Sequence, residues 1–129
     1  MTWKEFYNRI TPLFNGNINF TNLIRNGKLI ELKILYRMDQ FNHTPYLAKL
    51  ASTYNQLEIL KWLAQLSEPI VPTQEDANML AYNGNLEILK WMATLTPPIL
   101  PDEQGAFSAR RNHHKDVVEW LETFGIYSN

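Results

Sequence analysis

The sequence predicts an all-α solenoid of about four stacked helix-turn-helix repeats, with short loops and an N-terminal capping helix. Two observations carry this prediction. Residues 57–63 (LEILKWL) return as residues 86–92 (LEILKWM) and, more loosely, as residues 115–121 (KDVVEWL), 29 residues later each time. The same offset carries the loop segment 69–73 (PIVPT) onto 98–102 (PILPD). A period that runs through helices and loops alike is typical of repeat proteins.

The first predicted element, within residues 1–19, is a helix that caps the stack. Thr2 and Glu5 have the spacing of a capping box. Apolar residues recur at helical spacing along this segment: Trp3, Phe6, Tyr7 and Ile10. A stack of repeats needs its first apolar face covered, and we expect this helix to cover it. A helix that lies on a membrane or a partner is the less favoured alternative, because the segment holds only one Lys and one Arg.

Four repeat units follow within a single domain over residues 1–129, near residues 20–42, 43–71, 72–100 and 101–126. Each unit ends in a second helix whose apolar residues recur at the spacing of one helix face, as Leu86, Leu89 and Met92 do. We predict these second helices near residues 29–37, 57–66, 86–95 and 115–124. We also predict that the tryptophans of this helix are largely buried, pack between repeats and stack along the solenoid axis: Trp62, Trp91 and Trp120.

Each unit begins with a first helix, and one column of the repeat supplies its N-cap. Thr44, Thr73 and Asp102 share that column, and each has a side-chain oxygen that can accept from an unpaired backbone N–H. The chain must reverse between the two helices, at a column of residues that tolerate positive φ: Gly27, Asn55, Gly84 and His113. After the second helix, paired prolines favour an extended return loop, which Ile70 and Ile99 are predicted to anchor in the core.

Residues 80–92 (LAYNGNLEILKWM) resemble the ankyrin repeat, in which alanines, two variable residues and Gly-His precede a Leu-Glu-Val-Val-Lys-Leu-Leu helix. The LEILKWL form is similar to divergent ankyrin repeats that are abundant in large DNA viruses of protists. The resemblance covers about residues 20–126. The period here is 29 residues, whereas the family's is about 33. We therefore expect short loops with little or no strand in place of the family's β-hairpin.

Composition and motifs argue against several functional classes. The chain has no cysteine, and therefore no thiolate nucleophile or cysteine zinc site. Its formal net charge of -1 gives no general attraction to nucleic acid or anionic lipid. No phosphate-binding loop, nucleophile elbow or zinc-helix motif appears, and the adjacent His113 and His114 have no acidic or cysteine ligand at a suitable spacing. We expect a non-enzymatic cytoplasmic protein without cofactor, metal or membrane attachment.

The favoured function is a protein-protein interaction module. The resemblance implies that a partner protein binds the concave surface, through variable columns near the end of the first helix, on its earlier turns and in the connecting loop. In this sequence the candidate contact residues are Tyr46, Lys49, Thr53, Tyr54, Glu75, Asn78, Tyr82, Asn83, Gln104, Phe107, Arg111 and Asn112. If the chain is viral, the same resemblance implies that it modulates a host factor in the host cytoplasm.

Two alternative functions come from other features of the last unit. Its apolar residues could pair two copies of the chain as a homodimer: Val117, Trp120, Leu121, Phe124 and Ile126. The basic turn from Arg110 to Lys115 could contact nucleic acid, although the net charge argues against it.

Overall fold

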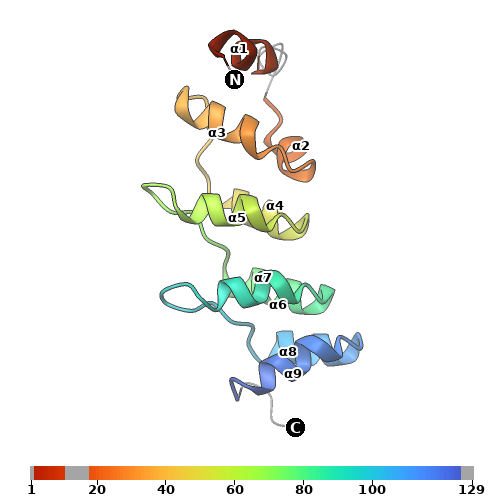
Figure 1. Cartoon of the computed structure of the whole chain (residues 1–129). Coiled ribbons are helices and arrows are strands. Elements are labelled where there is room, and N and C mark those ends of the chain that lie inside the picture. The colour runs from red at the N-terminus through yellow and green to blue at the C-terminus, as the bar shows by residue number, and fades with distance from the viewer. Residues whose placement is uncertain (1, 11–17, 126–129) are drawn as a thin grey trace.

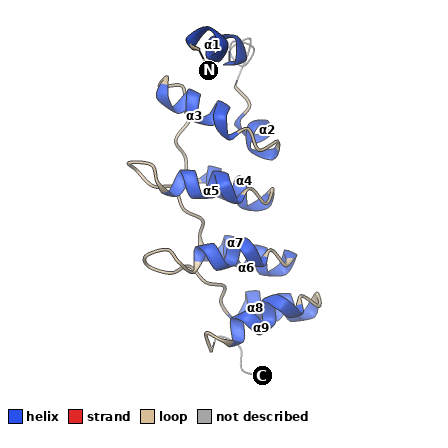
Figure 2. Ribbon diagram, in the orientation of Figure 1, coloured by secondary structure: helices blue, strands red, loops and turns tan. Residues whose placement is uncertain are grey.

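The computed structural model of this chain describes residues 2–10 and 18–125, and within them every regular element is a helix (Figures 1 and 2). The all-α class is confirmed, and no strand occurs in the described ranges. The helices are α1 (Trp3–Ile10), α2 (Phe20–Arg25), α3 (Leu29–Arg37), α4 (Tyr46–Thr53), α5 (Leu57–Ala64), α6 (Gln74–Asn83), α7 (Leu86–Met92), α8 (Glu103–Arg111) and α9 (Lys115–Glu122).

The helices form pairs that follow one another in a row, as Figure 1 shows. In each pair a first helix (α2, α4, α6, α8) turns back into a second helix (α3, α5, α7, α9) that packs beside it. Neighbouring pairs are joined mainly through their first helices, since α2 packs on α4, α4 on α6 and α6 on α8. Helix α1 packs on α3 at the N-terminal end. The second helices form the side nearest the viewer in Figure 1, and the first helices form the far side.

The helix ends follow local chemistry that the sequence largely predicts. At α6, the Thr73 hydroxyl accepts from the Asp76 N–H at 3.2 Å and the Asp76 carboxylate accepts from the Thr73 N–H at 3.0 Å, a complete capping box. At α8, Asp102 accepts from the Gln104 N–H at 2.9 Å. The expected cap at Thr44 is displaced: Pro45 stands at the cap position of α4, and Thr44 Oγ1 lies 3.4 Å from the Tyr46 N–H.

The N-terminal helix also shows its predicted capping box, with Thr2 and Glu5 exchanging bonds of 3.0 and 3.1 Å. The side chains of Trp3, Tyr7 and Ile10 lie outside the described part of the structure. None of the helices in residues 2–10 and 18–125 is long and apolar enough to cross a bilayer.

All four turns between first and second helices adopt the predicted left-handed conformation. The φ angles are +66° at Gly27, +58° at Asn55, +75° at Gly84 and +63° at His113. Glycine adopts this region without strain, and Asn and His are among the side chains that tolerate it best. The reversal therefore depends on one backbone conformation repeated in each unit.

The second helices begin at the predicted residues, but three of them end two or three residues early. Helix α5 ends at Ala64, α7 at Met92 and α9 at Glu122. Just after α7 and α9, a threonine hydroxyl donates back to a carbonyl of the last helical turn: Thr94 donates to Trp91 O and Thr123 to Trp120 O, both at 2.6 Å. Such side-chain bonds offer the last carbonyls an alternative to the helical hydrogen bonds.

The core takes repeated residues from both helices, and it corrects the expectation for the tryptophans. Ile59, Ile88 and Val117 occupy one buried column. The tryptophans are only half-buried and pack at the edge of the core: Trp62, Trp91 and Trp120. Each precedes a fully buried residue of its helix, and one residue along a helix rotates a side chain by about 100°. Among the described residues, no tryptophan ring stacks on another.

The return loops are anchored as predicted at Ile70 and less fully at Ile99. Ile70 is buried and its N–H donates to Leu63 O at 3.0 Å. Ile99 is half-buried, and its N–H donates to Met92 O at 3.1 Å. The same backbone bond closes both loops.

Candidate interaction surface

Three aromatic side chains stand exposed on the first helices, on the side away from the second helices. Tyr46 on α4 is 56% exposed, Tyr82 on α6 is 55% exposed and Phe107 on α8 is 52% exposed. Large aromatic rings bury more apolar area than almost any other residue when they find a partner. We call the exposed side of the first helices that carries these three rings the first-helix face.

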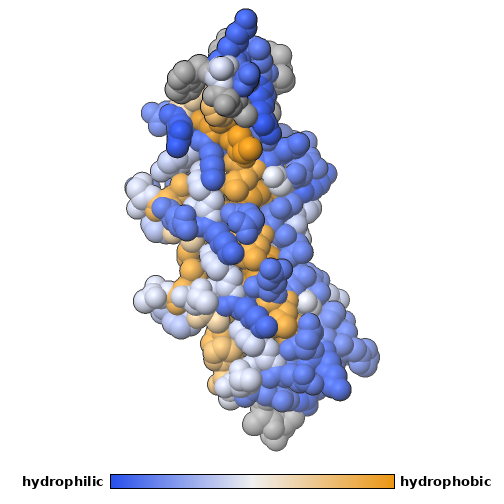
Figure 3. All heavy atoms as spheres, viewed as in Figure 1, coloured by the Kyte–Doolittle hydropathy of each residue, from blue (hydrophilic) through white to orange (hydrophobic). Residues whose placement is uncertain are grey.

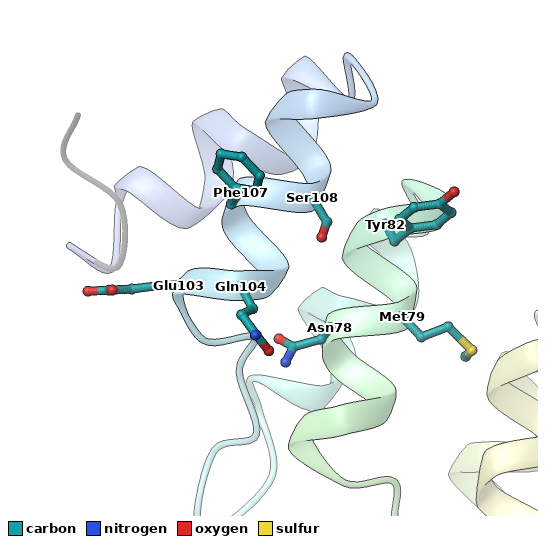
Figure 4. A pocket seen from close by; sticks show the side chains of 7 residues that line it. All are labelled: Asn78, Met79, Tyr82, Glu103, Gln104, Phe107 and Ser108. Carbon is teal, nitrogen blue, oxygen red and sulfur yellow. The ribbon is translucent and has the colours of Figure 1, made fainter.

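A groove of about 660 Å³ lies on this face between α6 and α8 (Figure 4). Figure 4 shows Tyr82 rising from α6 and Phe107 rising from α8, with polar side chains between the two helices. The lining residues are Asn78, Met79, Tyr82, Glu103, Gln104, Phe107 and Ser108. Four of the twelve predicted contact residues therefore come together in one groove.

The other three lining residues were missed by the sequence prediction. Met79 is half-buried and its sulfur lies 3.7 Å from the Thr53 hydroxyl on α4, so it bridges two units. Glu103 and Ser108 each directly neighbour a predicted residue on α8. The available signal was helical spacing, because Glu103 lies one turn before Phe107 and Ser108 lies one turn after Gln104.

The narrow base of the groove depends on a glycine. A Cβ atom at Gly105 of α8 would lie 2.8 Å from Pro101 Cβ and 3.1 Å from the backbone Cα of Asn78, closer than side chains pack. It would also overlap the side-chain oxygen of Asn78. The absence of a side chain lets α6 and α8 approach closely, and Tyr82 and Phe107 then flank the junction.

Asn78 serves the fold in addition to lining the groove. Its amide oxygen accepts from the Asp102 N–H at 3.0 Å and so links α6 to the start of α8. This bond commits the acceptor of Asn78 within the chain. Asn78 is therefore a weaker candidate for a partner contact than the sequence suggested.

Three other predicted residues also have partners within their own unit or a neighbouring one. Tyr54 is half-buried, with the Arg25 guanidinium 5.3 Å from its ring centre and within 3.4 Å of its hydroxyl. Thr53 donates to Lys49 O and the Asn112 amide donates to Ser108 O, both at 2.8 Å. Tyr54, Thr53 and Asn112 themselves do not line the groove. The remaining predicted residues also lie outside it and are exposed: Tyr46, Lys49, Glu75, Asn83 and Arg111.

The first-helix face carries opposite charges at its two ends. Glu75 and Glu103 lie in the first turns of α6 and α8, and Arg110 and Arg111 lie in the last turn of α8. Each charge has the sign that stabilises its helix end. The groove thus has two aromatic rings, with the Glu103 carboxylate at one end and the Arg111 guanidinium beyond the other.

Two of the residues named for self-association are buried within the last unit. Val117 and Leu121 are buried within the chain, and Ile126 lies outside the described residues. What is exposed is Phe124, whose ring meets that of Trp120 edge to face at 5.0 Å.

In the basic turn, His113 adopts the left-handed backbone conformation and the His114 ring lies over Gly84 of the preceding turn. Both histidines therefore have a role in the turn geometry. Within residues 2–10 and 18–125, no three His, Cys, Asp or Glu side chains converge as metal ligands would. Comparisons of the whole chain with models of protein families, with curated proteins and with solved structures give no match.

Proposed function

We propose that the chain is a solenoid of ankyrin-like repeats that works as a non-enzymatic protein-interaction module, and that a partner protein binds its first-helix face. The repeat assignment is supported by the 29-residue period, the helix pairs that follow one another and the left-handed turn in each unit. Repeat stacks of this kind present an extended surface on which exposed residues vary while packing residues recur. The host-factor and cytoplasmic parts of the expectation are supported by the sequence resemblance alone.

The observation that carries the binding proposal is the pair of exposed aromatic rings at the α6–α8 groove. Tyr82 stands in the column that holds Thr53 and Arg111 in the neighbouring units, and Phe107 in the column that holds Lys49 and Asn78. Packing between units does not require either ring, because the neighbouring units fold with other residues at the same positions. Tyrosine and phenylalanine are enriched in the buried cores of protein interfaces.

The test is the double variant Tyr82→Ala, Phe107→Ala, beside the variant Tyr82→Ala, Arg111→Ala, which probes the end of the first helices. Candidate partners are isolated by affinity capture on the wild-type chain and identified. Their binding to the wild-type chain and to each purified variant is then measured by calorimetry. We expect either double variant to weaken binding of the genuine partner by about 2 kcal/mol, roughly thirtyfold in Kd. The thermal midpoint stays within a few degrees of wild type, because the altered residues are exposed.

Val71→Ala is the matched control, since Val71 is an exposed apolar residue of a return loop and lies outside the groove. It keeps full affinity. A folded groove variant that binds the partner at full strength would move the interface to another face. A groove variant that unfolds would make these aromatic residues structural.

A further inference from the structure

A second surface, on α3, differs from the matching surfaces of the other units. The outward residues of α5, α7 and α9 begin with an acid and include a tryptophan, whereas α3 has isoleucine at both positions. The first column reads Ile30, Glu58, Glu87, Asp116, and the tryptophan column reads Ile34, Trp62, Trp91, Trp120. A third column reads Arg37, Gln65, Thr94, Thr123. Helix α3 alone thus replaces an acid by an apolar residue and a neutral residue by a cation.

These replacements leave two cations on α3 without acidic partners. On α5, Lys61 forms an ion pair with Glu58 at 3.6 Å. The equivalent of Glu58 on α3 is Ile30, so Lys33 lacks this partner, and Arg37 adds a second positive charge one turn later. Within the described residues, neither Lys33 nor Arg37 forms a salt bridge.

A groove of about 520 Å³ crosses α3 at this position, between α1 and α5. Phe6 of α1 and Trp62 of α5 line it at either side, with Ile30, Ile34 and Met38 from α3. Ile34 stands where the other units have tryptophan, and its smaller side chain leaves room for the groove. The groove is lined by Lys33 and Arg37 and by no carboxylate of the described residues.

The apolar part of this groove is accessible from outside. Ile30 is 46% exposed and Met38 is 40% exposed. Figure 3, which views the second-helix side, shows hydrophobic atoms gathered below α1 at the level of α3, with hydrophilic side chains beside them. This surface, the α3 groove, lies on the second-helix side, away from the first-helix face.

We propose that the α3 groove binds an acidic amphipathic helix of a partner protein. Lys33 and Arg37 are one helical turn apart, and carboxylates spaced one turn apart on a partner helix match that separation. An apolar stripe between such carboxylates fits a groove lined by Ile30, Ile34 and Trp62. Nucleic acid would use the two cations but leave the apolar lining uncovered. A bilayer surface is met by protruding residues, and this site is hollow.

The test uses three labelled helical peptides of about 16 residues, roughly four turns. One has a leucine stripe flanked by glutamates, one has the same stripe flanked by lysines, and one keeps the glutamates with serines in place of the leucines. Fluorescence anisotropy should show the wild-type chain binding the first at least about tenfold more tightly than the other two.

Two variants of the chain test the assignment to α3. Ile30→Glu introduces the acid that the other units have, at an exposed position, and Lys33→Glu with Arg37→Glu reverses the charges. Each should remain folded by circular dichroism and lose at least about tenfold in affinity for the first peptide. Matched controls are Lys90→Glu, in the Lys33 column of α7, and Arg111→Glu, in the basic turn, and both retain it.

The proposal would be overturned if the first peptide did not bind at millimolar concentration, or if the lysine or serine peptide bound equally well. It would also be overturned if the folded Ile30→Glu and charge-reversed chains kept full affinity. A further contrary result is that the wild-type chain binds no peptide but co-sediments with phosphatidylserine vesicles, and that the charge reversal abolishes this co-sedimentation. That result would make the α3 groove a membrane contact.

Discussion

The junction between the first two helix pairs and the junction between the last two are held together by different chemistry. At the N-terminal junction, aromatic rings from α2, α3, α5 and the α3–α4 loop meet edge to face, with ring centres 5.5 to 5.9 Å apart: Phe20, Tyr36, Phe41 and Trp62. At the C-terminal junction, α6 and α8 approach through Gly105 and small residues, and Asn78 binds the backbone of Asp102. One repeat geometry is thus reached by large rings in one place and by close backbone approach in another.

The two junctions share some residues and differ in others. Both junctions need the buried aliphatic columns and the left-handed turns, which recur in every unit. The contacts added around those columns differ from junction to junction, because each has only to fill the space between its two neighbours. Substitutions at the two junctions should therefore differ in kind and in size.

The largest effect is expected at the aromatic junction. Trp62→Ala removes a half-buried ring together with its edge-to-face contacts to Tyr36 and Phe41, and should lower the free energy of unfolding by about 3 kcal/mol. Trp91→Ala, in the same column, removes a half-buried ring that has no such contact in the described structure, and should cost about 2 kcal/mol or less. Urea unfolding of both variants measures the difference. Equal losses would show that the ring contacts add nothing to burial.

A smaller effect is expected at the close junction. Gly105→Val places atoms against Pro101 and the α6 backbone, and should cost about 2 kcal/mol by overpacking. Gln104→Val is the matched control, because it puts the same side chain on the exposed neighbouring position of α8. Thermal unfolding should separate the two. A Gly105→Val chain as stable as the control would mean that α6 and α8 can move apart without loss.

The smallest effect is expected where α1 meets α3. Glu31 is buried and forms an ion pair with the half-exposed Arg9, and its carboxylate has no second partner among the described residues. Arg9→Ala leaves that carboxylate unpaired and should weaken the docking of α1 by about 1 kcal/mol, a value reduced because Arg9 is partly in water. Hydrogen exchange should report this loss in α1 while α6 keeps its protection.

Adding Glu31→Gln to Arg9→Ala should restore part of the docking, because the neutral amide is less costly to bury than an unpaired carboxylate. If Arg9→Ala lowered protection in α6 as well, the cap junction would control the whole stack.

Helix positions and turns were predictable from the sequence because they depend on columns within one unit. The positive φ at Asn55 and His113 followed from their alignment with Gly27 and Gly84. The edge position of the tryptophans did not follow, because an apolar column at the margin of a helix face looks the same in sequence as one at its centre. The aromatic junction was missed for a related reason: Phe41 comes from a loop and shares no column with Trp62.

The candidate surface was predictable only in outline. The variable columns of the first helices pointed to Tyr82 and Phe107, which do line one groove. They could not reveal that Asn78 binds Asp102, because that contact joins different positions of successive units. Nor could they indicate the α3 groove, since its shape depends on where α1 and α5 lie around Ile34.

The row of helix pairs also has a mechanical consequence. Because each pair packs mainly on the pairs beside it, a load applied along the row passes through every junction in series. The most compliant junction then takes up most of the extension. The groove on the first-helix face lies across a single junction, between α6 and α8. A small rotation between those two units would therefore change its width. The width of this groove thus depends on how far the row of helix pairs is bent.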